Sequence, residues 1–423
     1  MLKLSSLILC LFVAQLIYCQ SDWQWTELPS MPMRTANNAV CEAEAGGQEY
    51  VFSFGGIDTT KVYSGIHNRC FRYDVTGNSW SEIDTLPDAP KIASGASYVN
   101  GKIYVIGGYH VSQSGNEVSS SKVHIYNPTT NAFEADGALI PTPIDDQVQC
   151  VYKDSLIFIV TGWSNNGNVP NVQIYDTYLN QWSAGTSTTN NAFYTAFGAS
   201  GAIIGDTLYY HGGATGGSFG AKTFMRRGFI NPADPTDITW TLMDNAPGTA
   251  GYRSACSTRG STILWVGGSA TSYNYDGIAY DGSGGVDPSA RVLHFNNDLQ
   301  MYSDETNQPY GVMDLRGIAK LANDRWIICG GMDTNQVVSN RTFLLENTSL
   351  HLTESANHTF SLNDFGSYVV IQSPVVAEAK IVDEQGRIVK EFNSNSVFEI
   401  HRTESEIGIY YFIQKEQIVR IIL

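Results

Sequence analysis

A short apolar run that ends in a glycine pair, or in its remnant, recurs six times along this 423-residue chain. The copies are Val51–Gly56, Tyr104–Gly108, Phe158–Gly162, Leu208–Gly213, Ile263–Gly268 and Trp326–Gly331. The intervals between their last glycines are 52, 54, 51, 55 and 63 residues. Self-similarity at such a period indicates a repeat architecture in which each copy is one supersecondary unit.

Two further marks follow most copies in a constant order. A strand that ends at Asp or Asn comes next, as in Phe71–Asp74 and His124–Asn127, and an aromatic residue such as Trp80 or Trp182 then opens another strand. One four-stranded unit cannot bury both of its faces alone, so several units must stack. Closing the stack into a ring removes the exposed strand edges. We therefore predict an all-β chain whose main body is a closed ring of blades.

These marks together resemble the kelch repeat over residues 23–346. The resemblance implies a six-bladed kelch-type β-propeller, with one four-stranded blade per repeat. The sixth repeat lacks an aromatic-opened last strand after Leu345, whereas the segment Trp25–Pro29 is spare at the N-terminus. We expect that segment to complete the last blade and to join the two ends of the ring.

The residues from Phe360 onward predict short strands and a small C-terminal β-sandwich domain at 360–423, after a linker at 347–359. The stretches Ala379–Val389, Glu406–Phe412 and Ile418–Leu423 resemble the C-terminal sorting domains of type IX secretion cargo in Bacteroidota. The resemblance implies the type IX secretion machinery as a partner and passage across the outer membrane. The usual Asn-Pro opening of that family is absent, which leaves the start of the domain open. A purely structural β-sandwich is the alternative.

The N-terminus has the pattern of a signal peptide. Lys3 precedes the apolar run Leu7–Ile17, which is too short to span a bilayer, since a membrane helix needs roughly 20 apolar residues. Ile17 and Cys19 fit the positions before a signal-peptidase cut, so we predict a signal peptide at 1–19 and a secreted protein, extracellular or on the outer cell surface. A buried N-terminal strand is the alternative. We predict no transmembrane segment elsewhere.

The net charge of the chain limits the class of partner, and the spacing of its cysteines limits the kind of metal or redox site. The chain has 25 Lys and Arg against 41 Asp and Glu, a formal net charge of −16, which argues against nucleic-acid binding because that requires a basic stripe. The five cysteines beyond the signal peptide are widely spaced and match no zinc or redox motif. Buried free thiols are the favoured interpretation, with one disulfide as an alternative.

Ligand sites in kelch propellers usually lie over the mouth of the central channel, so we expect residues just before each inner strand to approach it. These candidates are Arg34, Lys91, Asp145, Tyr194, Arg253 and Arg316. Four cations in such a ring would suit the carboxylate of an acidic sugar or acidic peptide; packing between repeats is the alternative. Tyr109 and Trp163 at strand ends add aromatic faces on which sugars stack. Long loops after the glycine pairs extend this face.

The motifs of known kelch-fold enzymes help to decide between an enzyme and a binding module. Sialic acid mutarotases resemble this chain in size, but their Glu, six residues before an Arg, is missing from Gly212–Gly220, and the ligand set of galactose-oxidase-like copper enzymes is absent. We therefore predict a non-catalytic glycan- or protein-binding module, without catalytic residues, cofactor or metal. A carbohydrate-active enzyme of the sialic acid mutarotase or epimerase type is the alternative, and a structural surface component is a third. The run Asp276–Asp287 keeps Ca²⁺ open, since Ca²⁺ takes several oxygen ligands.

Overall fold

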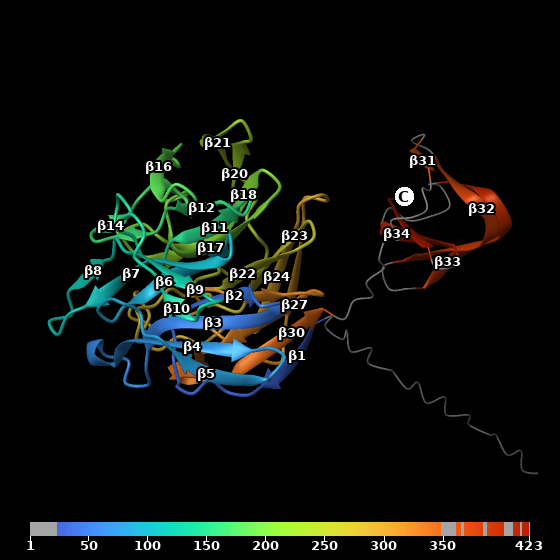
Figure 1. Cartoon of the computed structure of the whole chain (residues 1–423). Coiled ribbons are helices and arrows are strands. Elements are labelled where there is room, and N and C mark those ends of the chain that lie inside the picture. The colour runs from blue at the N-terminus through green and yellow to red at the C-terminus, as the bar shows by residue number, and fades with distance from the viewer. Residues whose placement is uncertain are drawn as a thin grey trace, which may run out of the picture. The chain divides into compact units, whose positions relative to one another are not determined.

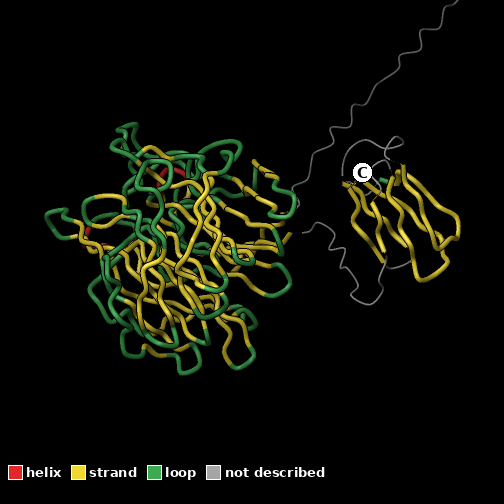
Figure 2. Tube along the Cα trace, turned by 90° about the horizontal axis from the view of Figure 1, so that it is seen from above, coloured by secondary structure: helices red, strands yellow, loops and turns green. Residues whose placement is uncertain are grey.

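The computed structural model describes residues 23–347, 361–364, 368–383, 387–401, 409–414 and 417–422. The chain divides into two compact units, one ending at Asn347 and the other beginning at Thr348. Strands and loops dominate the described part (Figure 2), whose helices are the short 3-10 turns η1 (Tyr63–Gly65) and η2 (Thr334–Gln336). None of these helices is long and apolar enough to cross a membrane. The expected signal peptide and the expected linker beyond residue 347 lie outside the described residues.

The first unit contains six antiparallel sheets of four main strands, which confirms the predicted six-bladed propeller. The first blade consists of β2 (Ala39–Ala45), β3 (Gln48–Ile57), β4 (Ile66–Asp74) and β5 (Ser79–Ile83). The second consists of β6 (Ile92–Val99), β7 (Lys102–Val111), β9 (Val123–Asn127) and β10 (Ala132–Phe133), with β8 (Glu117–Ser119) beside β7. The third blade consists of β11 (Val148–Tyr152), β12 (Leu156–Val160), β15 (Val172–Asp176) and β16 (Gln181–Gly185). The fourth consists of β17 (Phe197–Ile204), β18 (Thr207–Thr215), β20 (Met225–Asn231) and β21 (Asp234–Leu242), with β19 (Gly220–Ala221) beside β18. The fifth is β22 (Ala255–Arg259), β23 (Thr262–Val266), β24 (Arg291–Asn296), β25 (Met301–Thr306). Two small hairpins, β13 (Trp163–Ser164) with β14 (Gly167–Asn168) and β28 (Met332–Asp333) with β29 (Val337–Val338), stand apart.

The sixth blade takes its strands from both ends of the unit. It consists of β26 (Ala319–Leu321), β27 (Arg325–Cys329), β30 (Thr342–Asn347) and β1 (Trp23–Leu28). β1 is antiparallel to β30, from Trp23 opposite Asn347 to Leu28 opposite Thr342, and the two lie side by side in blue and orange in Figure 1. The outermost strand of this blade is therefore the first strand in the described part of the chain.

The glycine pairs are required where the second strand of a blade approaches the segment that leads into the next blade. A Cβ on Gly107 would lie 2.3 Å from the carbonyl oxygen of Ile144, and one on Gly212 would lie 2.0 Å from that of Gly251. Both glycines also have left-handed φ, of +68° and +74°, a conformation that glycine adopts without steric cost. These contacts explain why the motif recurs once per blade.

The tryptophans that open the outer strands connect neighbouring blades. Each indole Nε1 donates to a backbone carbonyl of the connection that leads from the preceding blade into its own blade: Trp80 to Pro29 at 3.0 Å, Trp182 to Ala138 at 2.8 Å and Trp240 to Thr186 at 2.8 Å. A buried indole needs such a partner. The aromatic mark of the repeat therefore combines apolar packing with one fixed hydrogen bond.

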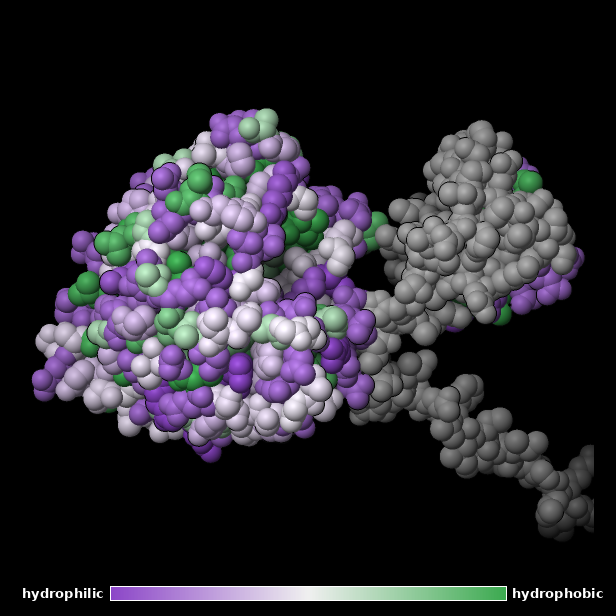
Figure 3. All heavy atoms as spheres, viewed as in Figure 1, coloured by the Kyte–Doolittle hydropathy of each residue, from purple (hydrophilic) through white to green (hydrophobic). Residues whose placement is uncertain are grey.

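The hydrophobic core of the propeller lies between the blades, and the outer surface of the propeller is polar. Phe52 of the first blade packs against Tyr126 of the second with ring centroids 5.4 Å apart, as one example of this contact. The face in Figure 3 is mostly hydrophilic, with hydrophobic residues scattered among polar ones. All five propeller cysteines are free, and only Cys256 among them is not fully buried.

The C-terminal unit forms one antiparallel sheet in the order β31-β32-β34-β35, with β33 also paired to β32. Its strands are β31 (Ser361–Asp364), β32 (Tyr368–Asp383), β33 (Ile388–His401), β34 (Ile409–Gln414) and β35 (Gln417–Ile422). β32, with 16 residues, is longer than the expected short strands, and its two halves pair with different partners, β31 and β34. The small β-sandwich domain expected at 360–423 stays a prediction.

Candidate functional site

A ring of hydrogen bonds encircles the propeller axis where the inner strands begin. Each blade contributes one residue with left-handed φ, and these six residues form the axial ring: Asn37, Ala93, Asp146, Gly198, Arg253 and Asp314, with φ of 56°, 58°, 49°, 67°, 48° and 63°. Their backbone N–H groups make five of the six links, as in Asp146 to Ala93 at 3.2 Å, Gly198 to Asp146 at 2.9 Å and Arg253 to Gly198 at 2.8 Å, and the N–H of Leu315 makes the sixth, to the carbonyl of Arg253 at 3.1 Å. A left-handed residue other than glycine costs about 1–3 kcal/mol and persists only where its surroundings fix it. The closed ring of blades supplies that constraint.

Four charged side chains fill the axis at this level, and we call them the axial network: Asp146, Arg253, Asp314 and Arg316. Arg253 holds both oxygens of Asp146, with Nε at 3.1 Å from Oδ1 and Nη2 at 2.6 Å from Oδ2, and its Nη1 lies 2.8 Å from Asp314 Oδ1. The nearest approach of Arg316 to Asp146 is longer, at 3.4 Å. Burial raises the pKa of Asp314 to about 6, although Arg253 opposes the shift. The network thus holds two cations against two buried carboxyls, and Arg316 is its most exposed member, at 9%.

The layer just before the axial ring is apolar except in the third blade. The equivalent positions in the other five blades carry Ala36, Ile92, Phe197, Tyr252 and Met313. Asp145 takes this position in the third blade, where its backbone pairs with that of Trp163 in both directions at 2.9 Å. A carboxyl group placed where the repeat puts apolar side chains departs from the local rule, and such departures concentrate at functional sites.

Asp145 opens onto a cavity of about 110 Å³ that we call the mouth pocket. Its lining comprises Tyr109, Glu117, Asp145, Asp146, Trp163, Phe197, Phe219, Arg253 and Tyr280. The aromatic side chains form a connected wall, in which the Phe219 ring lies 5.4 Å from that of Trp163 and 5.2 Å from that of Tyr280. The pocket therefore combines aromatic faces with three carboxyl groups and one arginine.

Burial favours the neutral form of two of these carboxyl groups. It raises the pKa of Asp145 well above the ordinary value, and the neighbouring Asp146 adds to the shift while a 2.6 Å hydrogen bond from Ser119 Oγ opposes it. Burial also raises the pKa of Glu117, which is half-buried. Protonated carboxyl groups donate as well as accept hydrogen bonds. The pocket can therefore serve both the hydrogens and the oxygens of a hydroxyl-rich ligand.

A second cavity, of about 440 Å³, adjoins the mouth pocket because the two share Trp163 and Phe219. We call it the amide groove, since four of the residues along it are asparagines: Asn166, Asn168, Asn190 and Asn191. Asn168 Nδ2 donates to the carbonyl of Ala214 at 3.2 Å, while its buried Oδ1 has no hydrogen-bond partner among the described residues. Side-chain amides provide both donors and acceptors without charge. Together the two cavities form an uncharged groove that leads to an acidic pocket.

The structure brings half of the predicted site residues together. Tyr109, Asp145, Trp163 and Arg253 all line the mouth pocket. The other four lie elsewhere, so the expected ring of four cations is not formed. Lys91 is buried against His124 at 3.0 Å and Asp88 at 3.3 Å. Arg34 is exposed, and its Nη1 lies 3.5 Å from the carbonyl of Val338.

The physical reason is the register of the inner strands. The axial ring follows the expected positions by one to four residues in the first four blades, and in the sixth blade Asp314 precedes Arg316. Tyr194 is half-buried, and its carbonyl accepts the Tyr210 hydroxyl at 2.8 Å, while Arg316 lies beyond the ring in a different cavity. Among the expected ring members only Arg253 coincides with the axial ring.

Sequence reasoning missed Glu117, Phe197, Phe219 and Tyr280 of the mouth pocket. Three of them come from the long loops after glycine pairs, which were expected to carry function but offer no periodicity that selects one residue. The acidic loop considered for Ca²⁺ uses its carboxylates locally, since Asp276 accepts the Ile278 N–H at 3.0 Å and Asp281 accepts the Ser283 N–H at 2.9 Å. Throughout the described residues, no group of three or more His, Cys, Asp and Glu side chains could hold a metal ion.

Comparison with known proteins supports the propeller architecture. The family model described as the kelch motif matches residues 93–135, which form the second blade. Beta-scruin of Limulus polyphemus is 29% identical over 161 residues, which span 36% of this chain and 16% of that protein. N-acetylneuraminate epimerase of Shigella sonnei is 25% identical over 284 residues, which span 66% of this chain and 67% of that protein. The solved structure of YjhT has a TM-score of 0.60 at 13% identity and covers 82% of this chain and 99% of its own. The chain is thus a six-bladed propeller that carries a kelch motif.

Proposed function

We propose that the propeller binds an uncharged sugar in the mouth pocket, with further sugar units along the amide groove. The observation that carries the proposal is Asp145, a carboxyl group at a position where the other five blades have apolar residues, facing an aromatic wall. Aromatic rings offer a stacking surface to the apolar face of a sugar, while carboxyl groups and amides pair with its hydroxyls. Both kinds of surface meet at Trp163.

The charges of the pocket oppose the acidic ligand that the sequence suggested. Arg253 is the pocket's cation, and it is already paired with both Asp146 and Asp314. A ligand carboxylate would have to displace one of these buried partners and would face Glu117 and Asp145 as well. An uncharged ligand meets neither obstacle. The proposal therefore replaces an acidic sugar with a neutral one.

A glycan array followed by isothermal titration calorimetry tests this function. We expect neutral oligosaccharides to bind and expect Trp163→Ala to weaken binding by about tenfold or more, since a tenfold loss corresponds to about 1.4 kcal/mol. Trp240→Ala is the matched control, because Trp240 bonds to Thr186 in the outer part of the fourth blade and lines neither cavity. Binding of a protein partner with no glycan bound, or equal effects of the two variants, would refute the sugar proposal.

A second candidate function is proton transfer on the bound sugar, and the raised pKa values of two neighbouring carboxyl groups favour it. Ring opening at the anomeric carbon requires a base that takes the hydroxyl proton and an acid that gives a proton to the ring oxygen. Asp145 has the stronger upward shift of pKa and suits the acid, which leaves Glu117 as the base. The similarity to N-acetylneuraminate epimerase over two thirds of that protein is consistent with this role.

Exchange spectroscopy by proton NMR, which measures interconversion of the two anomers, distinguishes catalysis from binding. Under the second candidate, Asp145→Asn lowers the exchange rate by about 10²–10⁴-fold while binding persists. An unaccelerated rate in the wild type, together with tight binding, would leave the binding function alone.

We also propose that the protein acts outside the cell that makes it. The apolar run Leu7–Ile17 supports export, and the resemblance of the tail to type IX sorting domains supports passage to the surface. Mass spectrometry of the protein from culture medium should give an N-terminus at Gln20 and a chain shortened at its C-terminus. Recovery of the full-length chain in the cell interior would refute this proposal.

A further inference from the structure

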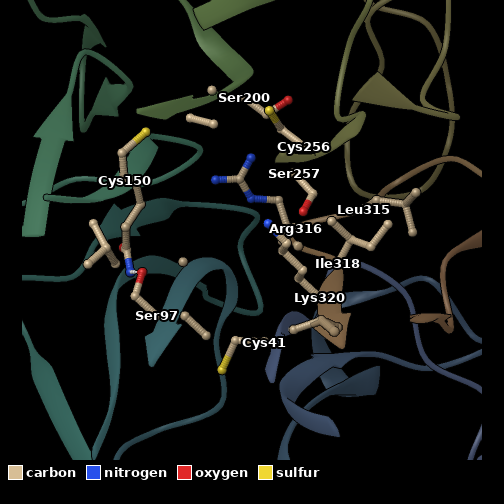
Figure 4. Close-up of a pocket in the computed structure, with 18 of the residues that line it drawn as sticks. Cys41, Ser97, Cys150, Ser200, Cys256, Ser257, Leu315, Arg316, Ile318 and Lys320 are labelled. Atoms are coloured by element: carbon tan, nitrogen blue, oxygen red, sulfur yellow. Dashed lines mark hydrogen bonds between the residues drawn. The ribbon is translucent and has the colours of Figure 1, made fainter. Parts of the chain in front are cut away.

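A third cavity, of about 290 Å³, occupies the central channel on the far side of the axial ring from the mouth pocket. Its lining residues follow the ring residues along the inner strands, whereas the mouth pocket is lined by residues at and before the ring and by loops. Figure 4 shows this channel cavity, with the guanidinium group of Arg316 extending into its middle. The axial network separates the two cavities.

Arg316 is buried with most of its donors unused. The residue is 9% exposed, and its Nη2 donates to the carbonyl of Gln147 at 2.9 Å while its Nη1 approaches Asp146 at 3.4 Å. Its Nε has no partner in the described part of the protein. A guanidinium group has five N–H donors, so these contacts occupy at most two of them. An underused buried cation is costly unless an anion completes its surroundings.

Arg253 leaves Arg316 short of negative charge. It takes both oxygens of Asp146 at 3.1 and 2.6 Å, so Arg316 reaches the same carboxylate only at 3.4 Å. A second cation, Lys320, lines the same cavity, and its Nζ donates to Thr258 Oγ1 at 3.1 Å. The one acid of the lining, Glu42, is occupied by the backbone N–H of Lys320 at 2.9 Å.

Two serine hydroxyls in the cavity are oriented as donors. Ser97 Oγ accepts from Gln149 Nε2 at 2.9 Å, and Ser257 Oγ accepts from Trp326 Nε1 at 2.9 Å. A hydroxyl that accepts from a fixed N–H group keeps its own proton for another acceptor. Figure 4 shows Ser257 beside Arg316 and Ser97 farther away, across the channel. The cavity thus presents two cations and two donor hydroxyls, and its acceptors in the described residues include the already hydrogen-bonded Glu42 and the unpaired Gln147 Oε1.

We propose that the channel cavity binds a small oxyanion, a carboxylate, phosphate or sulfate group, which pairs with Arg316 and accepts from the neighbouring Ser257. Arginine suits this role because its planar fork binds two oxygens of one such group. The site is separate from the sugar pocket on the other side of the axial network, and it does not depend on the proposed sugar binding.

Thermal unfolding of the full chain tests the proposal. Tryptophan fluorescence is followed with sodium sulfate, phosphate or acetate, at an ionic strength held constant with sodium chloride. We expect a saturable rise in Tm with at least one oxyanion, and loss of that rise in Arg316→Gln. Sulfate and phosphate also stabilise proteins by exclusion from the surface, and that general part survives in the variant. Arg227→Gln is the matched control, because Arg227 lies in β20 and lines none of the three cavities.

Calorimetry with the most effective oxyanion gives the stoichiometry and covers the case in which Arg316→Gln does not fold. We expect one ion per chain and expect Arg316→Lys, which keeps the charge but loses the fork, to weaken binding by at least tenfold. Preference for acetate over sulfate would identify a carboxylate ligand, and the reverse preference a tetrahedral oxyanion. Equal stabilisation of the wild type and Arg316→Gln by every salt, or undiminished binding by Arg316→Lys, would overturn the proposal.

Discussion

Replacing Arg253 with methionine should destabilise the propeller strongly and in a pH-dependent way. Arg253 is 1% exposed and neutralises two buried carboxyl groups, so its removal leaves Asp314 without its cation and Asp146 with only the distant Arg316. Breaking a buried ion pair from one side costs about 3–5 kcal/mol. At about 2 °C per kcal/mol for a large domain, the expected decrease in Tm is about 6–10 °C.

The pH dependence gives the sharper test. The folded-state pKa of Asp314 is already raised to about 6 with Arg253 present, and it must rise further without it. A carboxyl group with a raised folded-state pKa favours folding at low pH and loses that contribution as pH rises above its unfolded value. The loss caused by Arg253→Met should therefore be larger at pH 8 than at pH 5.

Urea unfolding followed by tryptophan fluorescence measures this loss. All eight tryptophans lie in the propeller, between Trp23 and Trp326, so the signal reports on that unit alone. Arg69→Met is the matched control, because Arg69 and Glu82 form an exposed pair with side chains 41% and 45% exposed, for which about 0–1 kcal/mol is expected. Equal losses in the two variants, or a loss from Arg253→Met that is the same at pH 5 and pH 8, would refute the assigned role of the axial network.

Three further perturbations test other parts of the fold. Gly212→Ala should prevent stable folding, because its Cβ would lie 2.0 Å from a carbonyl oxygen of Gly251, whereas Gly217→Ala meets nothing within 4 Å and should leave the Tm unchanged in a thermal melt. Deletion of residues 23–28 should expose the edge of β30 and produce aggregation or dimers in size-exclusion chromatography, and a monomer of unchanged Tm would contradict the role of β1. The five propeller cysteines should resist alkylation at pH 8 until urea unfolds the protein, since burial raises the pKa of Cys150 and Cys329 to about 12; rapid labelling of the native protein would contradict this.

The blade count was predictable because each mark of the repeat has a local physical cause. A glycine pair with left-handed φ and a neighbouring carbonyl within 3 Å of any Cβ leaves a signature in five of the six blades, while in the third blade Thr161, with φ of 48°, takes the place of the first glycine. The tryptophans of the outer strands likewise form the same hydrogen bond in three blades. Repetition of such signatures sets the architecture even where one copy is irregular.

The axial ring was not predictable in the same way. Asn37, Ala93 and Arg253 all have left-handed φ there, and no property of these side chains marks that conformation. The constraint comes from the closed ring, which no single repeat encodes. Tyr109 and Trp163 were identified because they directly follow a glycine pair, whereas Phe219 and Tyr280 reach the mouth pocket through loops whose course depends on the whole assembly.

The pairing of Trp23 with Asn347 separates the order of the blades in space from their order along the chain. Residues directly opposite each other in an antiparallel pair have Cα atoms about 4.5–5.5 Å apart, so a short linker could join these two positions. A circular permutant opened in the loop between β5 and β6 would then contain every blade as one continuous segment. In the natural chain the sixth blade can close only after the polypeptide has been made as far as β30, while β1 has been present from the start. In the native chain the sixth blade therefore cannot form until the whole propeller has been synthesised. In the permutant the four strands of that blade would be made one after another, and the contacts between blades would stay the same.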